Sequence, residues 1–506
     1  MQHRRNLSAS IHKLPTDVMV MIFAAYTESS SLVDTPNLLD LTTVNKLWYD
    51  TIINSPQLWT VLESDFPPKI ARLVIGRSKN FPLTLIWDTA SCAESESREL
   101  KEVLKVVAPN STRLKSIKMK VTEFWGPNRY IQQILESNMP HLERLEVKTV
   151  RDYDVQGERL GGFTLWDGPP LREIALDTIS LSSWDSPRLT GLVALDFTKP
   201  HQPPAIRTLW NILSNSPQLE RLRLCELGDS YDPWNYPNIE SITLPCLKEM
   251  FLGDLAGAYL SAMLMSVYAP PNANVHISGN VFGESSTVVL EEVFTPGNIH
   301  SAALLGLGDS GSRSSNIPVT MTIVFESSKL RMTKSGGADK REIVLRFRDD
   351  LSPRDVTILG QFFRALPQVP NVTLEIDIVA PTEESATVDL QLWSPSLCSL
   401  GVHRPAFCRS VLKQLVESTE DLVTGLSGWV CPNLTSVELC YIHEGEEVEG
   451  LDGIALESLV HARWSGRAGE ELLKFAIRCE EDRFPSIRSR AESLKQYIPR
   501  LSLVME

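Results

Sequence analysis

The segment PQLERLRL, from Pro217 to Leu224, carries the pattern that decides the fold: a proline followed by leucines at the third, sixth and eighth positions. Because side chains two residues apart lie on the same face of a β-strand, the last two leucines predict a strand with one buried face. The pattern recurs along the chain, with other apolar residues at some positions, and predicts an internal repeat. It appears as PHLERLEV at Pro140, PPLREIAL at Pro169, PCLKEMFL at Pro245, PSLCSLGV at Pro395 and PNLTSVEL at Pro432.

Segments with apolar residues three and four positions apart precede many of these strands, and this spacing predicts helices. They are RELKEVLKVVAP from Arg98, PNRYIQQILESNMP from Pro127, AIRTLWNILSNSP from Ala205 and RDVTILGQFFRALP from Arg354. Each repeat, roughly thirty residues long, has one apolar strand face and one apolar helix face, and only neighbouring repeats can cover both. The sequence therefore predicts an α/β fold whose main part is a curved solenoid of parallel strands.

Two regions depart from the regular repeat. Between residues 270 and 350 the predicted strands have short or absent helices, so we expect an irregular middle. These strands are predicted near Val275, Ala302, Ile323 and Ile343. Over residues 455–497 the apolar spacing indicates helices, and we interpret this segment as a cap on the open end of the sheet.

The stretch LPTDVMVMIFAAY, from Leu14 to Tyr26, predicts a helix that is apolar on two sides. Pro15 supplies the fixed φ that suits a helix start. One apolar side comprises Val18, Met21, Ile22 and Ala25, and the other comprises Met19, Phe23 and Tyr26. A single core needs only one such side, so the second predicts contact with a partner.

Apolar residues return at helical spacing after a polar break, and they predict two further short helices. These residues are Leu38, Leu41, Val44, Trp48 and Ile52, and the pattern stops at Asn54, Ser55 and Pro56. Leu58 and Trp59 follow directly after the stop. Three short helices make a unit too small to hold itself together well, and such a unit gains stability by docking on another protein.

Four short elements in this order resemble the F-box family. They are LP at Leu14–Pro15, IF at Ile22–Phe23, V-x-x-x-W at Val44–Trp48 and LW at Leu58–Trp59. The resemblance implies a helical module that binds the Skp-type adaptor of a cullin-based ubiquitin ligase. The adaptor-binding residues that it implies are Leu14, Pro15, Ile22, Phe23, Tyr26, Val44, Trp48, Leu58 and Trp59. Two features depart from the family pattern: Asn45 stands where cysteine is common, and the linker from Glu28 to Pro36 is long.

With its repeats, the chain resembles the large set of F-box proteins with degenerate leucine-rich repeats found in mushroom-forming fungi. The resemblance implies an α/β fold class: a small all-α F-box followed by a curved α/β leucine-rich-repeat solenoid, irregular in the middle. The predicted domains are 10–62 for the F-box, 63–97 for a linker and the first solenoid strand, 98–454 for the solenoid and 455–506 for a helical cap. An alternative interpretation of the first helices is an ordinary cap on the solenoid that contacts no partner.

Residues between the leucines of each strand point to the opposite face of the predicted sheet, because strand side chains alternate. These positions are Arg144, Glu146, Lys148, Glu173, Asp177, Arg221, Arg223, Glu249, Phe251, His403 and Glu438. Charges of both signs without an aromatic ladder indicate a shaped protein surface rather than a polyanion track. The candidate substrate-binding residues are Arg144, Glu146, Arg221, Arg223, Phe251, His403 and Glu438.

Composition and charge argue against several function classes. The 506 residues carry 49 Lys+Arg against 63 Asp+Glu, and the formal net charge of −14 repels nucleic acid. No run approaches the ~20 consecutive apolar residues of a membrane helix, and the first residues lack the apolar centre of a signal peptide. We therefore expect a cytoplasmic or nuclear protein without membrane contact. Eight cysteines without a CxxC pair predict reduced thiols.

Sequence motifs give no support for an active site, a cofactor or a metal. GLGDSG at Gly306–Gly311 matches G-x-G-x-x-G, but a serine-rich turn and Pro318 follow where a phosphate site needs a helix. His443–Glu444 lacks the second histidine of a HExxH motif, and no G-x-S-x-G motif is present. We expect a non-enzymatic subunit that binds a Skp-type adaptor with its cullin scaffold and an unknown protein substrate. The alternatives are an interaction scaffold without a ligase role and an unrecognised α/β enzyme.

Overall fold

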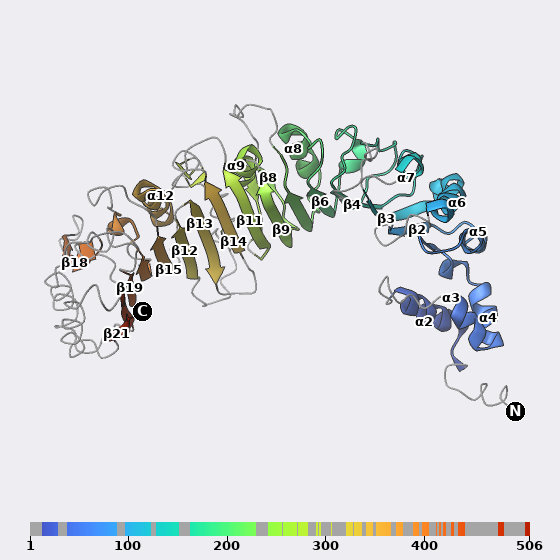
Figure 1. Ribbon diagram of the computed structural model, residues 1–506, viewed down its shortest axis with the longest axis horizontal. Coiled ribbons are helices and arrows are strands. Elements are labelled where there is room, and N and C mark those ends of the chain that lie inside the picture. Colours follow the sequence, from blue (N-terminus) through green and yellow to red (C-terminus); the bar gives the residue numbers. More distant parts are fainter. Residues whose placement is uncertain are drawn as a thin grey trace. The chain divides into compact units, whose positions relative to one another are not determined.

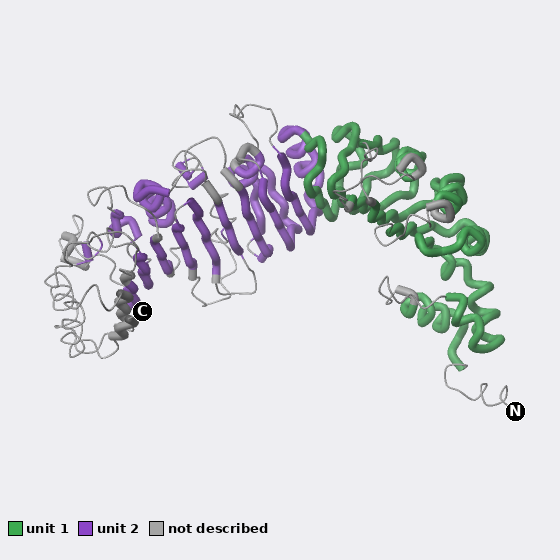
Figure 2. Tube along the Cα trace, in the orientation of Figure 1, with its two compact units in different colours: residues 1–204 green, residues 205–506 purple. Residues whose placement is uncertain are grey.

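The computed structural model divides the chain into two compact units, Met1–Pro204 and Ala205–Glu506 (Figure 2). The structure describes residues 13–28, 38–88, 97–122, 128–150, 162–228, 241–255, 257–270, 272–281, 290–291, 293–294, 305, 320–326, 328–335, 341–347, 351–365, 371–377, 388–393, 397–403, 411, 414–415, 418–420, 427–429, 434–440, 474–479 and 501–505. Each unit is a mixed α/β structure built on a mostly parallel, open sheet (Figure 1). Within these residues no helix is both long and apolar enough to span a membrane.

The first unit begins with the three short helices that the sequence predicts. They are α2 (Thr16–Glu28), α3 (Leu38–Val44) and α4 (Lys46–Ile53), followed by the 3₁₀-helix η2 (Pro56–Leu58). The side chain of Asn45 caps α4 by accepting a hydrogen bond of 2.9 Å from the Trp48 backbone N–H. An N-cap of this kind stabilises a helix by about 1 kcal/mol, which gives a structural reason for asparagine at this position.

Parallel strands follow in chain order, and each pairs with the next. They are β1 (Val61–Glu63), β2 (Leu83–Asp88), β3 (Leu114–Thr122), β4 (Arg144–Val150), β5 (Glu173–Asp177) and β6 (Ala194–Thr198). The helices between them are α5 (Pro68–Arg77), α6 (Ser97–Val107) and α7 (Asn128–Leu135), with the 3₁₀-helices η4 (Ala108–Arg113) and η5 (Pro187–Leu189). Figure 1 shows α5, α6 and α7 along one side of the strands, where the leucines of the motif are buried.

The segment 63–97, where a linker and the first solenoid strand were expected, contains the strand β2 and also the helix α5. Its strand alternates buried and half-buried residues, with Leu83, Leu85 and Trp87 inside. Strand β2 lacks the full leucine motif, so the sequence indicated it less clearly than the strands of the later repeats. The repeating strand and helix order therefore begins at β1.

Arg188, in the 3₁₀-helix η5, anchors the segments of chain that lead into β4 and β5. The side chain is buried, and its guanidinium donates hydrogen bonds to the carbonyls of Leu142 at 2.8 Å, Pro169 at 3.1 Å and Trp166 at 3.5 Å. Burial lowers the pKa of Arg188 from its usual value. These bonds satisfy backbone carbonyl groups that would otherwise be costly to bury.

The second unit continues the same plan with a larger sheet. In spatial order its strands are β7 (Arg221–Cys225), β9 (Glu249–Leu255), β11 (Asn274–Val281), β14 (Arg341–Phe347), β13 (Lys329–Ser335), β12 (Thr320–Glu326), β15 (Asn371–Asp377), β16 (Leu397–Val402), β19 (Ser436–Cys440), β20 (Lys474–Cys479) and β21 (Leu501–Met505). Its helices are α8 (Ile206–Ser214), α9 (Gly257–Ser266), α12 (Pro353–Arg364) and the 3₁₀-helix η6 (Leu390–Trp393). Two small sheets pair β8 (Ile242–Thr243) with β10 (Val267–Tyr268), and β17 (Ser418–Glu420) with β18 (Ser427–Trp429).

The expected irregular middle is confirmed by the order of three strands. Strands β12, β13 and β14 form an antiparallel meander, in which β14 pairs with β11 and β12 pairs with β15. Among the described strands of this sheet, β13 is the one that runs against its neighbours. The strand predicted near Ala302 lies outside the described residues.

Gly360 allows η6 to pack closely on α12. A Cβ atom at this position would lie 2.8 Å from Nε1 of Trp393, which is closer than real Cβ atoms come to a neighbour. At the start of the same helix, the Asp355 carboxylate accepts a hydrogen bond of 2.7 Å from the Ser352 backbone N–H. Helix α12 is thus fixed at its first turn and along its length.

Most sequence-based elements are confirmed, and one is wrong. The four predicted helices correspond to α6, α7, α8 and α12, and five of the six motif strands begin four residues after their proline, at positions 144, 173, 221, 249 and 436. The expected helical cap is contradicted where the structure describes it, because Ile477 lies in strand β20 and β21 pairs with β20. Residues 475, 477 and 479 are apolar at alternate positions, and this period places them in a strand. The rest of that segment lies outside the described residues.

Candidate functional sites

An apolar stripe lies exposed along α2. We define the α2 stripe as Val18, Met21, Ile22 and Ala25, all of which are exposed to solvent. These positions are spaced by three and four residues, so they share one face of the helix. The Met21 side chain is 70% exposed, which is unusual for methionine in a folded chain. Val44, at the end of α3, is a further exposed apolar residue at 52%.

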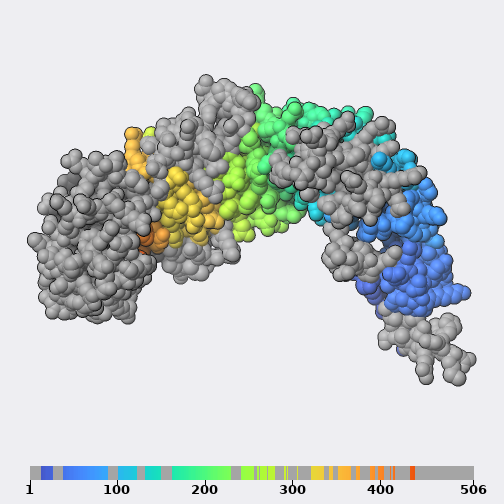
Figure 3. Space-filling model, viewed as in Figure 1, coloured from blue at the N-terminus to red at the C-terminus, as the bar shows by residue number. Residues whose placement is uncertain are grey.

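The opposite side of α2 holds the helical segment together. Met19, Val20 and Phe23 are buried there, and the rings of Phe23 and Trp48 lie 5.0 Å apart at an angle of 60°. The structure thus assigns the core to the side with Phe23 and leaves the other apolar side of α2 on the surface. Figure 3 shows this N-terminal part of the first unit in blue.

The residues expected to bind an adaptor divide into three groups. Pro15, Ile22, Tyr26 and Val44 are exposed, and Leu14 and Trp48 are partly exposed. Phe23, Leu58 and Trp59 are buried inside the same chain, so a direct contact of these three with a partner is not available in this structure. Their role here is to position the exposed residues. The expected set also omitted the exposed residues Val18, Met21 and Tyr49, although Val18 and Met21 could have been found from the helical spacing.

Trp59 links the helical segment, α2 to α4, to the helix α5. Its indole N–H donates a hydrogen bond of 2.8 Å to the carbonyl of Ile52 at the end of α4. The guanidinium of Arg77, at the end of α5, lies over the same ring at 5.1 Å from its centroid. A buried indole with a satisfied N–H and a cation over its face is well suited to fix two elements to each other.

Charged side chains cover the face of the first unit's sheet opposite the buried leucines. We define the charged face as Asp88, Lys118, Lys120, Arg144, Glu146, Lys148, Glu173, Asp177 and Asp196, carried on β2 to β6. Alternation along each strand brings them together: in β4, Leu145 and Val147 are buried while Arg144, Glu146 and Lys148 face outward. The expected positions Arg144 and Glu146 therefore lie on one surface.

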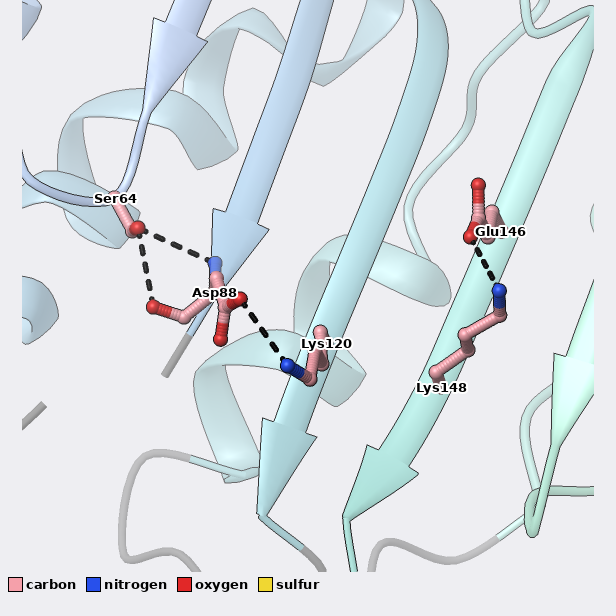
Figure 4. Close-up of polar contacts among 5 residues, drawn as sticks. All are labelled: Ser64, Asp88, Lys120, Glu146 and Lys148. Atoms are coloured by element: carbon pink, nitrogen blue, oxygen red, sulfur yellow. Dashed lines mark hydrogen bonds and ion pairs between the residues drawn. The ribbon is translucent and has the colours of Figure 1, made fainter. Parts of the chain in front are cut away.

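Each cation of the charged face has an anion within reach. The nitrogen-to-oxygen distances are 3.4 Å for Arg144–Glu173 and 3.9 Å for Lys118–Glu146. They are 2.9 Å for Lys148–Glu146 and 3.6 Å for Lys120–Asp88, the two pairs drawn in Figure 4. Ser64 adds support at β2, because its hydroxyl accepts a hydrogen bond of 3.2 Å from the Asp88 backbone N–H. Such exposed pairs contribute little to the stability of the fold.

Lys148 shows the electrostatic effect of this network. Its hydrogen bond to Glu146 raises the pKa of Lys148 above its usual value, partial burial opposes the rise, and the charges of Glu146, Asp196 and Asp177 add to it. Because the folded pKa lies above the unfolded one, the stabilising contribution is complete at neutral pH and is lost as the pH rises through the folded pKa.

Replacing Glu146 with glutamine should lower the pKa of Lys148 toward that of a free lysine, because the hydrogen bond to a carboxylate is the largest cause of the rise. The measurement is a pH titration of the Lys148 side-chain signal by NMR on lysine-labelled protein. Glu143→Gln is the matched control, since Glu143 pairs with Lys115 at 3.4 Å. Equal Lys148 titration curves for the two variants would contradict the assigned cause.

The candidate binding residues of the second unit lie on the outward face of its sheet. Arg221 and Arg223 are exposed on β7, and Phe251 is half-buried on the adjacent β9. Farther along the sheet, beyond the meander of β12 to β14, His403 follows β16 and Glu438 lies on β19. Both residues are partly exposed. The sequence-based set missed His276 on β11 and Glu342 on β14, which lie in the irregular middle.

No protein-family model matches this chain, and no curated protein matches it either. Function is therefore argued from the chain's own residues.

The described residues contain no group of three or more His, Cys, Asp or Glu side chains placed to hold a metal ion. The GLGDSG segment at 306–311 and the His443–Glu444 pair lie outside the described residues. Cys225 and Cys440 both occupy the last position of their strands, β7 and β19. Cys225, Cys246 and Cys398 form no disulfide, and burial raises the pKa of Cys398, which disfavours a reactive thiolate.

Proposed function

We propose that this chain is the substrate-recognition subunit of an SCF-type cullin ubiquitin ligase. In this proposal α2 to α4 bind a Skp-type adaptor, and the outward faces of the sheets bind a protein substrate. The observation that carries the proposal is the exposed α2 stripe on a helix whose other side is already packed.

The energetics of the α2 stripe favour a partner. Burying one large apolar side chain contributes roughly 1.5–3 kcal/mol, so a row of exposed ones represents stabilisation that is gained only on docking. The partner-facing side is supported before binding, because Phe23 is buried on the other side of α2 and its ring packs on Trp48. A prearranged surface loses little conformational entropy on binding, which raises its affinity.

The ordered elements of the F-box pattern agree with this arrangement. Ile22 and Val44 supply exposed side chains, while Phe23, Leu58 and Trp59 supply the internal packing. Each element of the pattern thus has either a surface role or a core role in the same small segment. This division supports a docking module over an ordinary cap.

The sheet faces suit a protein substrate. Their exposed residues carry charges of both signs, and neighbouring strands lie at a fixed spacing of about 4.8 Å. A recognition subunit needs to hold its substrate close to the transferred ubiquitin, and proximity of this kind requires no catalytic group on the chain itself.

The test is reconstitution of the full-length chain with a purified Skp-type adaptor, followed by size-exclusion chromatography with light scattering. We expect one stoichiometric complex. Affinity purification from cells with the proteasome inhibited should then recover the cullin scaffold together with proteins that accumulate only under inhibition. Elution of chain and adaptor as separate species would overturn the proposal, and recovery of the adaptor without any accumulating protein would favour a scaffold without a ligase role.

A further inference from the structure

Four side chains from four neighbouring strands form a single row on the outward face of the second unit's sheet. We define the planar row as Arg223 on β7, Phe251 on β9, His276 on β11 and Glu342 on β14. The strand register pairs Arg223 with Phe251, Phe251 with His276 and His276 with Glu342. Consecutive strands of a sheet lie about 4.8 Å apart, which matches the spacing at which flat groups stack.

The members of the planar row are in contact from one end to the other. The guanidinium of Arg223 lies 4.7 Å from the centroid of the Phe251 ring. The rings of Phe251 and His276 lie 4.8 Å apart and only 16° from parallel, and Nδ1 of His276 is 3.2 Å from a Glu342 carboxylate oxygen. Each side chain is therefore held by its neighbours before any partner arrives.

A glycine makes room for the central ring. A Cβ atom at Gly253, two residues beyond Phe251 on the same strand, would lie 2.8 Å from Cε1 of the Phe251 ring. The ring therefore extends along β9 over a position that has no side chain. Cys225 Sγ, at 3.2 Å from the same point, closes the other side of this space.

The planar row is accessible to a partner. Arg223 is exposed, and so is Arg221, which lies two residues earlier on the same face of β7. The side chains of His276 and Glu342 are 37% and 40% exposed. Arginine and aromatic residues dominate the energetics of protein interfaces, and a stacked arginine gives up less rotamer freedom when it binds.

The chemistry of the two arginines selects an acidic ligand. A guanidinium stacked on a ring keeps its N–H donors in its own plane, and its fork of donors matches the two oxygens of a carboxylate. Each guanidinium carries five N–H donors, so Arg221 and Arg223 can keep contacts within the chain and still bind a carboxylate.

The neighbouring charges favour a singly charged group over a phosphate. Carboxylates stand beside the arginines of this face: Glu249 lies opposite Arg221 in the strand register, and Glu342 lies within 3.9 Å of Arg331. Both carboxylates would repel a dianionic phosphate more strongly than a singly charged carboxylate.

We infer that the planar row and Arg221 form a recognition patch for a protein segment that carries an Asp or Glu side chain beside an apolar one. The carboxylate lies against Arg221 and Arg223, and the apolar side chain covers the exposed part of Phe251. This inference rests on the proposed function, since it identifies the class of substrate segment that the subunit captures.

The test is selection of random twelve-residue peptides, displayed on phage, against the immobilised full-length chain. Arg223→Gln and Phe251→Ala remove the two central groups. Arg207→Gln is the matched control, because Arg207 is an exposed arginine of the same unit that lies on helix α8 instead of a strand. Thermal melting checks that each variant is folded.

We expect peptides enriched in Asp and Glu from the wild-type chain and from Arg207→Gln, with the enrichment lost in both other variants. A selected peptide should bind about tenfold or more weakly when its Asp becomes Asn, as expected for loss of a charge-assisted pair. No acidic enrichment, or enrichment that survives Arg223→Gln, would overturn the inference. Tighter binding of a phosphoserine version would overturn the choice of carboxylate.

Adaptor binding by the same variants separates this inference from the proposed function. Arg223→Gln and Phe251→Ala lie outside α2 to α4, so both should bind the Skp-type adaptor as the wild-type chain does. Failure of peptide selection with intact adaptor binding would reject only the recognition patch. Peptide selection without adaptor binding would reject only the ligase role.

Discussion

Replacing Met21 with glutamate is expected to weaken binding of the Skp-type adaptor strongly while leaving the chain folded. Met21 is the most exposed residue of the α2 stripe, at 70%, so the substitution removes little internal packing. In the complex the new carboxylate would be buried against apolar groups without a partner, and loss of a central interface residue of this kind costs about 2–4 kcal/mol. The affinity should therefore fall by roughly 30-fold to 1000-fold, measured by isothermal titration calorimetry.

Phe81→Glu provides the matched control for this experiment. Phe81 is also an exposed apolar residue of the first unit, but it lies just before β2 and outside the helical segment. Its replacement should leave the adaptor affinity unchanged. Both variants should unfold within about 0.5 kcal/mol of the wild-type chain, as is usual for exposed positions. Full adaptor affinity in Met21→Glu would show that the α2 stripe is not the docking surface.

Trp59→Ala is expected to lower the free energy of unfolding by about 3–5 kcal/mol, the range for truncating a large buried aromatic residue. The substitution empties the site between α4 and α5, removes the hydrogen bond to Ile52 and leaves Arg77 without the ring beneath it. The measurement is urea unfolding followed by circular dichroism.

Trp166→Ala is the control for the stability experiment, because Trp166 is 52% exposed in the same unit. Its loss should change the free energy of unfolding by no more than about 1 kcal/mol. Equal losses for the two tryptophans would mean that Trp59 does not anchor the helical segment. Adaptor binding should also weaken in Trp59→Ala, because the exposed residues of α2 depend on this packing.

The repeat strands could be predicted from local sequence because their signal is local. A proline followed by leucines at alternate positions fixes both where a strand begins and which face is buried, as β7 shows from Arg221 onward. The spacing of apolar residues likewise predicted the helices α6, α7, α8 and α12. Segment 474–479 was misassigned because apolar residues over a few positions fit a helix and a strand alike, and pairing with β19 and β21 decides between them.

The sequence did not show which of the two apolar sides of α2 is buried and which is exposed. Val18, Met21, Ile22 and Ala25 form a regular helical row, and Met19 and Phe23 form a second one. The choice between them is made by tertiary packing, because Trp48 approaches the Phe23 side. The sequence therefore predicted that α2 has two apolar sides, but not which one faces solvent.

Only two of the four residues of the planar row could be placed on the outward face from the sequence. Arg223 and Phe251 lie in motif strands, so the alternation placed both on the outward face. His276 meets Glu342 only because the meander returns β14 to the side of β11, with β12 and β13 beyond it. A pairing across that many residues depends on strand order, which local patterns do not encode.

Oxidation footprinting of two methionines on α2 tests the docking of this helix most directly. Met19 is 2% exposed and Met21 is 70% exposed, so Met19 serves as an internal reference for the oxidation of Met21. In the free chain, peroxide should oxidise Met21 much faster than Met19, as read by mass spectrometry of the peptide that contains both. Adding the Skp-type adaptor should protect Met21 and leave Met19 unchanged. Unchanged oxidation of Met21 in a chain that has bound the adaptor would show that the exposed side of α2 is not where the adaptor docks.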